Sequence, residues 1–547
     1  MPPKRQKQFS HHVKKSKEAQ QPVSETEFLE AADEFEASAG KWKAGDAARA
    51  VRFYNRAIST YDEGLKKYPK SFDLAYNKAL LLYNIAQDKR IMSQIGSSLD
   101  MLKEALDAHK YALSIDQENA DVLFNTAQVL TSFAEELNDM ADDEDNVKSQ
   151  CVSLLQEAVE LFNACLSRQE MEYSEIQELI SQGPQNITEI QAKYPESEKI
   201  SSDSPTIEPE EWATVKEPVT PNTLVETALA QLGSLSSLAT ISAPTSSSLL
   251  ANLTEIAGPI VTQRLPGYLA LLPTSVAKDP NEPDAPPFLS VSSSSSTFHA
   301  REKSDDNNPQ ASARAAADLA IAVFTVAIAG AEYRSKLCDI VQYYERVTQA
   351  FAPLLMNAGL GTYPENSHVP IHSAYADALV EFAEYAAKME DQDPSPDALA
   401  RRWTALETAQ AQLTEATNKL PDVLPAESPL PTKAEIYFTR ANVELMRRRL
   451  SQAPSASSAI KANEKILLKN AGVYYRGTAA LAKRDGNAEL EKDASERNKI
   501  IQALEQGLVK DSVTAIKEYF EAQDSSDIAA IADEMAEDDL LFNDRQA

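Results

Sequence analysis

Apolar and small residues recur along this chain at the spacing of one helical face, and the same arrangement returns several times. Ala50, Tyr54 and Ala57 are separated by four and then three positions, so they share one side of a helix. Gly45 precedes this helix as a turn residue, and Pro69 marks its end. A second amphipathic helix follows the proline. The stretch therefore predicts two helices that pack face to face.

The four-then-three spacing returns in three further places. It recurs at Ala105, His109 and Ala112, at Ala158, Phe162 and Cys165, and at Ala409, Leu413 and Ala416. The helices after the first two copies also resemble each other, since Y-N-K-A at 76–79 is echoed by F-N-T-A at 124–127. A helix that buries only one face must pack against a neighbour, so a recurring amphipathic pair predicts a helical repeat protein.

The late copy carries most of the signature A-x3-F-x2-A-x4-P, with Leu413 at the aromatic position and Pro421 at its end. Over about 25–170 and 370–450 the chain thus resembles a tetratricopeptide repeat (TPR) protein. The resemblance implies an all-α, right-handed superhelix of antiparallel helix pairs, in which the first helix of each pair lines a concave groove. The alternative is a non-repeat helical bundle that uses Ala for close packing.

Shifts in composition divide the chain into seven segments. We expect a disordered basic arm (1–24), an N-terminal TPR block (25–170), a linker (171–220), an isolated repeat helix (221–241), a disordered insertion (242–310), a C-terminal helical block (311–522) and an acidic tail (523–547). Within the insertion, L-L-A-N-L-T-E-I could form a short helix. The stretch Ala311–Met356 predicts one long helix or two in line. The tail is either a docking peptide or a solubilising segment.

Charge and cysteine content narrow the class of partner. The formal net charge of -30 disfavours direct nucleic-acid binding, which needs clustered cations, and favours a basic protein partner. Cys151, Cys165 and Cys338 form no disulfide framework, which indicates a reducing compartment, cytoplasmic or nuclear. The apolar run Ala315–Ala331 contains Asp318 and is mostly Ala and Val, so we expect a buried helix there and no membrane association.

The first residues of the chain are strongly basic. Lys4, Arg5, Lys7, Lys14, Lys15 and Lys17 precede the first acid. They form either a nuclear-localisation segment or a solvated tail.

No catalytic constellation is found in the sequence, so neither an enzyme nor a cofactor is expected. Motifs for phosphate loops, zinc proteases, serine hydrolases and dinucleotide binding are all missing. His368 and His372 are four apart, but Pro370 between them argues against the regular helix that a two-histidine metal site uses.

The TPR resemblance also allows a test for chaperone binding. TPR co-chaperones of Hsp70 and Hsp90 hold a terminal carboxylate with Lys, Arg and Asn. Asn77 fits the pattern, but Asp121 and Asn125 stand where Lys and Arg belong. We therefore expect no carboxylate-clamp binding to Hsp70 or Hsp90, since like charges at close range are unfavourable.

Two groups of residues are the candidates for partner binding. The groove candidates are Asp73, Tyr76, Asn77, Asp121, Phe124, Asn125 and Arg440, for which ordinary helix packing is the alternative. The acidic loop contains Asp139, Asp142, Asp143, Glu144 and Asp145. It resembles a very small version of the acidic insertion in interrupted-TPR histone chaperones, and the alternative is a solvated loop.

These observations lead to three functional hypotheses. The first is an adaptor or dedicated chaperone for a basic client of the ribosomal-protein or histone type. The second is a scaffold subunit that binds a neutral partner helix. The third, a membrane-associated TPR receptor, would use Ala315–Ala331.

Overall fold

A computed structural model describes residues 22–140, 145–182, 218–242, 247–273, 308–389, 394–421, 424, 428 and 430–542. Every regular element within these residues is helical, which confirms the predicted all-α class. The first half contains α1 (Glu25–Lys43), α2 (Ala47–Lys67), α3 (Phe72–Gln87), α4 (Lys89–Ile95), α5 (Ser98–Ile115), α6 (Ala120–Asp139), α7 (Asp145–Ser181), α9 (Pro221–Ile241), α10 (Ser247–Pro259), the π-helix η2 (Ile260–Arg264) and α11 (Leu265–Leu271).

The second half is also built of helices alone in its described residues. It contains α12 (Pro309–Arg334), α13 (Ile340–Gly359), the short 3₁₀ helix η3 (Glu365–Ser367), α14 (His368–Met389), α15 (Pro396–Lys419), α16 (Lys433–Gln452), α17 (Ser458–Lys461), α18 (Glu464–Asp485), α19 (Ala488–Glu505), α20 (Val513–Glu521) and α21 (Ser526–Glu537).

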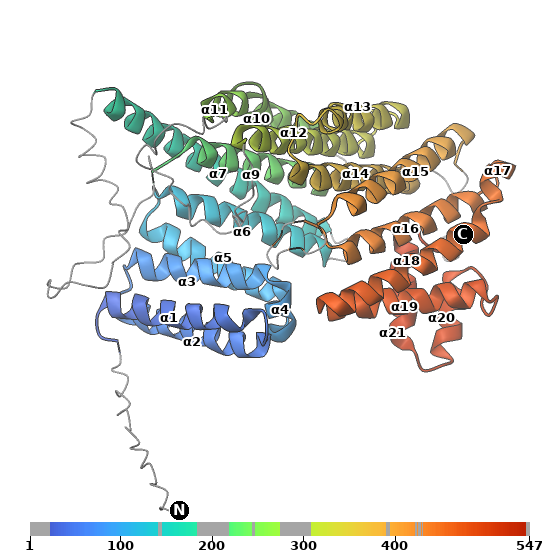
Figure 1. The fold of residues 1–547 in the computed structure, drawn as a ribbon, viewed down its shortest axis with the longest axis horizontal. Coiled ribbons are helices and arrows are strands. Elements are labelled where there is room, and N and C mark those ends of the chain that lie inside the picture. Colours follow the sequence, from blue (N-terminus) through green and yellow to red (C-terminus); the bar gives the residue numbers. More distant parts are fainter. Residues whose placement is uncertain are drawn as a thin grey trace, which may run out of the picture.

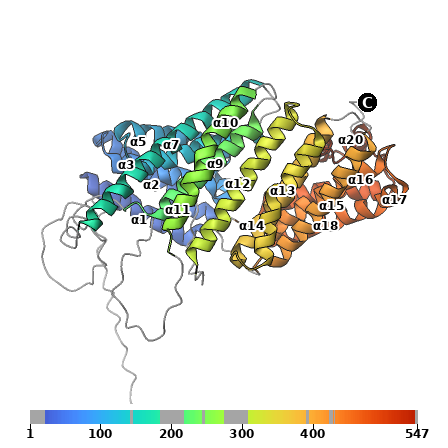
Figure 2. The ribbon, with the colours of Figure 1, turned by 90° about the horizontal axis from the view of Figure 1, so that it is seen from above.

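The helices follow one another round an arch (Figure 1). The N-terminal arm begins with α1 and α2, the region from α9 to α13 forms the top, and α14 to α21 form the C-terminal arm. Figure 2 shows the same order from above, with α9, α12, α13 and α14 side by side. The arms also touch, because Lys89 Nζ of α4 lies 2.8 Å from Glu435 Oε1 of α16. The superhelical arrangement matches the predicted class, whereas assignment to the TPR family stays a prediction.

Small residues set the close packing of the predicted repeat helices. Ala50 and Ala57 of α2, and Ala105 and Ala112 of α5, are completely buried. Asp46 accepts a hydrogen bond from the backbone of α2, as an N-cap does. The predicted four-then-three faces are therefore the faces by which α2 and α5 pack.

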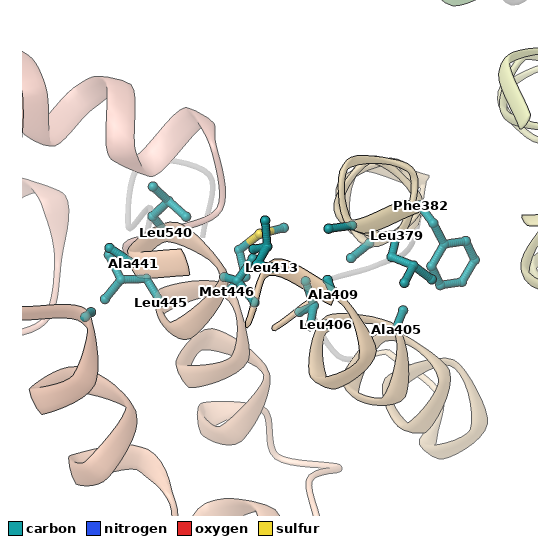
Figure 3. Close-up of a cluster of buried hydrophobic side chains, with 14 of the residues drawn as sticks. Leu379, Phe382, Ala405, Leu406, Ala409, Leu413, Ala441, Leu445, Met446 and Leu540 are labelled. Atoms are coloured by element: carbon teal, nitrogen blue, oxygen red, sulfur yellow. The ribbon is translucent and has the colours of Figure 1, made fainter. Parts of the chain in front are cut away.

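The C-terminal arm has a continuous apolar core. Figure 3 shows Leu379 and Phe382 of α14 beside Leu406 of α15, while Met446 of α16 packs against Leu540. All five side chains are almost completely buried. The chain beyond α21 thus contributes to the core of the arm. This contact is a test of the prediction that residues 523–547 form an acidic tail.

The prediction of an acidic tail at 523–547 is wrong for the residues that are described. Ile528, Ala532 and Met535 follow helical spacing, and they bury the inner side of α21. Leu541 is also buried, and the backbone carbonyl of Phe542 accepts a hydrogen bond from Val513 N at 3.0 Å. The many acids of this segment are on the other side of an amphipathic helix. Residues 543–547 lie outside the described residues.

Two other predicted boundaries are corrected. The linker was expected from 171, but α7 continues to Ser181, and residues 183–217 lie outside the described part. The insertion at 242–310 contains ordered helices α10, η2 and α11, whose Leu250, Leu253 and Ile260 are buried against α9 and α12. The predicted short helix within L-L-A-N-L-T-E-I is therefore confirmed as part of α10. Residues 274–307 are not described.

The predictions for residues 221–241 and 311–356 can also be compared with the observed helices. The helix predicted at 221–241 agrees with α9, and Thr220 caps it as expected. That helix is not isolated, since it packs between α7 and α12. Within 311–356, α12 and α13 are separated by a turn at 335–339 and pack side by side instead of running in line.

Two helices are long and apolar enough to cross a membrane by composition alone. They are Pro221–Ile241 and Pro309–Arg334, and most of each apolar window is buried by neighbouring helices. They also pack against each other within the core. A core helix of a soluble protein passes the same test, so this finding is weak support for a membrane span.

Candidate functional site along the polar seam of the arch

A row of polar contacts between side chains and neighbouring helices runs from the N-terminal arm to the middle of the arch. We call it the polar seam. Its hydrogen bonds join Tyr76 to Asn125 (2.6 Å), Tyr83 to Ser132 (3.0 Å), Thr131 to Ser234 (2.7 Å), Ser237 to Glu135, and Arg334 to the carbonyls of Ala239 (2.8 Å) and Thr240 and to Tyr385 (3.1 Å). These contacts connect α3, α6, α9, α12 and α14 in turn.

Arg334 is the central cation of this seam. Its guanidinium lies on the ring of Tyr385, 4.5 Å from the centroid, and donates to both helix α9 and the Tyr385 hydroxyl. The last carbonyls of a helix have no partner within that helix, and here the guanidinium satisfies two of them. Arg334 therefore fixes the end of α9 against α14.

Three carboxyl groups lie on one face of α14, and one of them, Glu381, is next to Arg334. Burial is the main cause that raises the pKa of Asp377, to about 6, and the negative charge of Glu381 adds to it. Burial likewise raises the pKa of Glu384, to about 7, and the charge of Asp538 adds to it. The pKa of Glu381 is also raised by burial, although the Tyr385 hydroxyl and Arg334 oppose the shift. We call these three residues the α14 acids.

A fourth acid lies at the other end of the seam. Burial raises the pKa of Glu135 on α6, and the hydrogen bond from Ser237 partly offsets the rise. Surrounding protein thus removes hydration from carboxyl groups along the whole seam. A cation that approaches an ionised carboxylate in such surroundings lowers its free energy and so stabilises the charged form.

The predicted groove residues of the N-terminal arm divide into three kinds. Tyr76 and Asn125 bond to each other, and Asn125 is only 2% exposed, so it serves the packing between α3 and α6. Phe124 packs edge-on against Phe162, with ring centroids 5.6 Å apart. Asn77 is half-buried. Asn125 and Phe124 thus take part in the packing between helices, and their selection as groove contacts stays a prediction.

The predicted acids of the groove lie in the first turns of their helices. Asp73 is half-buried at the start of α3, and Asp121 is exposed at the start of α6. The charge of Asp121, after burial, raises the pKa of Tyr76, so these two residues are neighbours. Both acids remain candidates for contact with a partner.

Arg440 is separate from that group. It lies on α16, where its Nη2 donates to the Tyr474 hydroxyl at 2.6 Å and its guanidinium covers the Tyr474 ring. The arginine therefore joins α16 to α18, and the structure does not bring it together with the N-terminal candidates.

Only part of the predicted acidic loop is described. Asp139 is the last residue of α6, and partial burial by its neighbours raises its pKa although its surface stays largely exposed. Asp145 begins α7, whereas Asp142, Asp143 and Glu144 lie outside the described residues. The six predicted nuclear-localisation residues, Lys4, Arg5, Lys7, Lys14, Lys15 and Lys17, also lie outside them.

A groove lies away from the seam, between α2, α3 and α5. This groove has a volume of about 490 Å³ and an apolar floor that includes Leu65, Ala75 and Ala108. Glu104 and Asp107 of α5 stand at its edge, and both are exposed. The groove therefore offers a competing position for a basic peptide.

The histidine pair tests the expectation about metals. Pro370 does not prevent a helix, because α14 begins at His368 and the proline falls in its first turn, where its missing N–H breaks no helical bond. The expected interruption is therefore wrong. His372 Nδ1 is hydrogen-bonded to Gln412 at 2.6 Å. Among the described residues no group of three His, Cys, Asp or Glu side chains is arranged to hold a metal ion.

Sequence reasoning missed the α14 acids and the hydroxyl groups of the seam. The missed residues are Ser132, Ser234, Ser237, Arg334, Asp377, Glu381, Glu384 and Tyr385. Asp377, Glu381 and Glu384 do carry a signal, because their spacing of four and three puts them on one helical face.

Comparisons with known proteins give limited likenesses. No family model matches the chain. The UPF0656 protein C926.02 of Schizosaccharomyces pombe is 38% identical over 74 residues, which are 14% of this chain and 16% of that protein. The match thus spans about a sixth of the relative's length.

Among solved structures, a circular tandem repeat protein is aligned over 94% of this chain and 97% of its own, with a TM-score of 0.28 and 13% identity. The nuclear import adaptor Nro1, described as a hypoxic regulator of sterol synthesis, is aligned over 74% of this chain and 92% of its own, with a TM-score of 0.31 and 10% identity. None of these likenesses assigns the chain to a family.

Proposed function

We propose that this protein is a non-enzymatic helical-repeat platform that binds a basic segment of another protein, as an adaptor or dedicated chaperone. A ribosomal protein or a histone is the type of client that fits. The observation that carries the proposal is the row of α14 acids beside the polar seam, where burial raises all three pKa values and the charges of Glu381 and Asp538 add to the rise at Asp377 and Glu384.

The negative charge of the ionised α14 acids favours a cationic ligand. At neutral pH the α14 acids are partly or fully ionised at a cost in free energy, since they lose hydration and repel each other. A Lys or Arg side chain placed between them removes part of that cost, and an acidic ligand increases it. The net charge of -30 adds long-range attraction for a basic segment.

The seam also provides the polar groups that a peptide main chain requires. The half-buried hydroxyls of Ser132 and Ser237 lie along the route between α3 and α14, whereas Ser234 is buried and bonds to Thr131. Asp73, Asn77 and Asp121 extend the same candidate surface toward the start of α3 and α6. In this proposal the client follows the seam from the N-terminal arm to the α14 acids.

A second candidate function is a scaffold subunit that binds a neutral partner helix. The observation that favours it is on α18, where Ile466 and Val473 are seven residues apart and are 59% and 49% exposed. Positions seven apart share a helical face, so these side chains could form an apolar seam with a partner helix. This surface is distinct from the α14 acids.

The test is the affinity of the full chain for a labelled peptide in which Lys and Ser alternate, measured by fluorescence anisotropy. The triple variant Asp377→Asn, Glu381→Gln, Glu384→Gln should bind at least about ten-fold more weakly, a loss of about 1.4 kcal/mol. The matched control is Glu63→Gln, Glu104→Gln, Asp107→Asn, which removes three exposed carboxylates from α2 and α5.

The two variants separate the possible results. Loss of binding in the first variant alone supports the α14 site, and raising the salt to about 0.5 M should weaken it further. Loss in the control alone would move the peptide to the groove between α2, α3 and α5. Equal small losses in both would leave only non-specific attraction by net charge, and that result contradicts the proposal.

A further inference from the structure

The first helix pair carries an arrangement of aromatic and basic side chains that the acidic composition does not predict. Phe28, Phe35 and Trp42 occur at intervals of seven along α1. Arg49 of α2 covers the Trp42 ring, 3.5 Å from its centroid, and Arg56 covers the Phe35 ring at 4.2 Å. Lys67 lies 4.7 Å from the Phe28 ring. Cations of α2 thus cover all three aromatic rings.

Arg52 completes a row of guanidinium groups on α2. Arg49, Arg52 and Arg56 are three and then four residues apart, so they share one face of the helix. Arg52 and Arg56 are exposed, and Trp42 is 36% exposed beneath Arg49. We call Arg49, Arg52, Arg56, Trp42 and Phe35 the basic-aromatic face. Figure 1 shows that α1 and α2 form the free end of the N-terminal arm.

None of these three arginines forms an ion pair with any carboxylate in the described part of the chain. This is informative because the chain has 83 acidic residues against 53 Lys and Arg, so carboxylate partners are abundant. Stacking on an aromatic ring holds the plane of a guanidinium while its N–H groups at the edge stay free to donate. The face is therefore a set of positioned, unused donors.

We propose that the basic-aromatic face of α1 and α2 binds an acidic peptide segment of a partner protein. Carboxylates accept two parallel hydrogen bonds from a guanidinium, which is the geometry that a stacked arginine presents. Arg49 and Arg56 are seven residues apart, about 10 Å along the helix axis. Acidic side chains two residues apart on an extended peptide lie on one face, about 7 Å apart, which is close to the rise of about 6 Å between Arg52 and Arg56.

The charge of the whole protein favours a short acidic peptide over nucleic acid. A duplex or single strand carries a long, regular row of phosphates, and a net charge of -30 would repel it along its length. A peptide with a few carboxylates needs only this local row of three arginines. The site is separate from the α14 acids and takes the opposite charge.

Binding is measured with the full chain and a labelled peptide in which Glu and Ser alternate, at low salt. The variant Arg49→Gln, Arg52→Gln, Arg56→Gln should weaken the affinity by about ten-fold or more, as loss of charge-assisted hydrogen bonds would. The control Lys465→Gln, Lys469→Gln, Lys499→Gln removes the same number of exposed positive charges from α18 and α19 and should change the affinity by less than about two-fold.

A second variant separates recognition by guanidinium from simple attraction. Arg49→Lys, Arg52→Lys, Arg56→Lys keeps the charge but removes the planar donors, so the proposal expects weaker binding than in the natural chain. Binding should also change the fluorescence of Trp42, and a Trp42→Phe variant should lose that change. Circular dichroism melts confirm that each variant is folded.

Several results would overturn the proposal. The arginine-to-glutamine variant and the control that replaces Lys465, Lys469 and Lys499 could lose affinity equally. The arginine-to-lysine variant could also bind as well as the natural chain. A fluorescence signal that survives Trp42→Phe would place the peptide elsewhere. Tighter binding of single-stranded oligothymidylate, lost in the glutamine variant, would show that the face is a nucleic-acid site.

Discussion

Arginines at the two ends of the arch are used in different ways. On α2, Arg52 and Arg56 are exposed and have no carboxylate partner among the described residues. In the C-terminal arm, Arg402, Arg448 and Arg497 are only 2–5% exposed, and each is paired with an acid. A buried guanidinium without a partner would be very costly, whereas an exposed one remains hydrated.

The comparison explains why the acidic C-terminal segment is folded. Asp539 pairs with Arg402 at 3.0 Å, and Glu534 pairs with Arg497 at 2.5 Å. Arg449 covers the Phe542 ring. The segment therefore supplies counter-charges for two of the three buried arginines, whereas Arg448 pairs with Asp511 of the preceding turn. No such segment covers α2 in the described part of the chain.

The largest effect is expected from removing one buried arginine. Arg497→Ala leaves Asp493 and Glu534 without their partner and should lower the free energy of unfolding by about 3–5 kcal/mol. Arg52→Ala, at the other end of the arch, should change it by less than about 0.5 kcal/mol. Urea unfolding followed by circular dichroism measures both. Equal losses would show that the two sets of arginines do not differ.

The apolar side of α21 gives the next effect. Met535→Ala removes a completely buried side chain and should lower the free energy of unfolding by about 2–5 kcal/mol. Leu508→Ala, in the exposed turn before α20, is the control and should cost less than about 0.5 kcal/mol. A small loss for Met535→Ala would mean that α21 is a loosely attached tail after all.

A smaller, pH-dependent effect is expected at the α14 acids. The pKa of Glu384 is raised to about 7 in the folded protein, so ionisation above that pH destabilises the fold. Glu384→Gln should therefore raise stability by about 1–2 kcal/mol at pH 8, after allowance for partial exposure, and this gain should disappear below the unfolded-state pKa of about 4.3. A gain that is independent of pH would contradict the raised pKa.

The smallest effect concerns the contact between the arms. The Lys89 side chain is 81% exposed in its ion pair with Glu435, so Lys89→Ala should change stability by no more than about 1 kcal/mol. Its consequence should be a wider distribution of distances between spin labels on α4 and α16. An unchanged distribution would show that other contacts hold the arms together.

The sequence predicted what depends on periodicity and capping. The limits of α9 follow from Leu224, Ala228 and Leu232 on one face and Thr220 at the cap. It failed for α21, where eight acids between Asp524 and Asp544 conceal the spacing of Ile528, Ala532 and Met535. The acidic composition of that segment indicated a tail, whereas the spacing of its apolar residues indicated a helix.

The candidate site was harder to predict than the fold. A hydroxyl such as Ser237 has no signature of its own, because its role depends on which helix lies beside α9. Asp121 and Tyr76 were both selected from the repeat pattern, and the structure brings them close together. Predicting the raised pKa values of the α14 acids would also have required the positions of α12 and α21.

The central claim is that carboxyl groups on α14, whose pKa values are raised, bind a cationic segment. The most direct test is to measure the protons released on binding. Calorimetric titration with the alternating Lys–Ser peptide at about pH 6.5, in two buffers of different ionisation enthalpy, counts protons exchanged on binding. The pKa values of Asp377 and Glu384, about 6 and about 7, should fall when a cation arrives, so binding should release protons. Release should be reduced in Glu384→Gln. Binding without proton release would show that the peptide contacts other residues and would contradict this account.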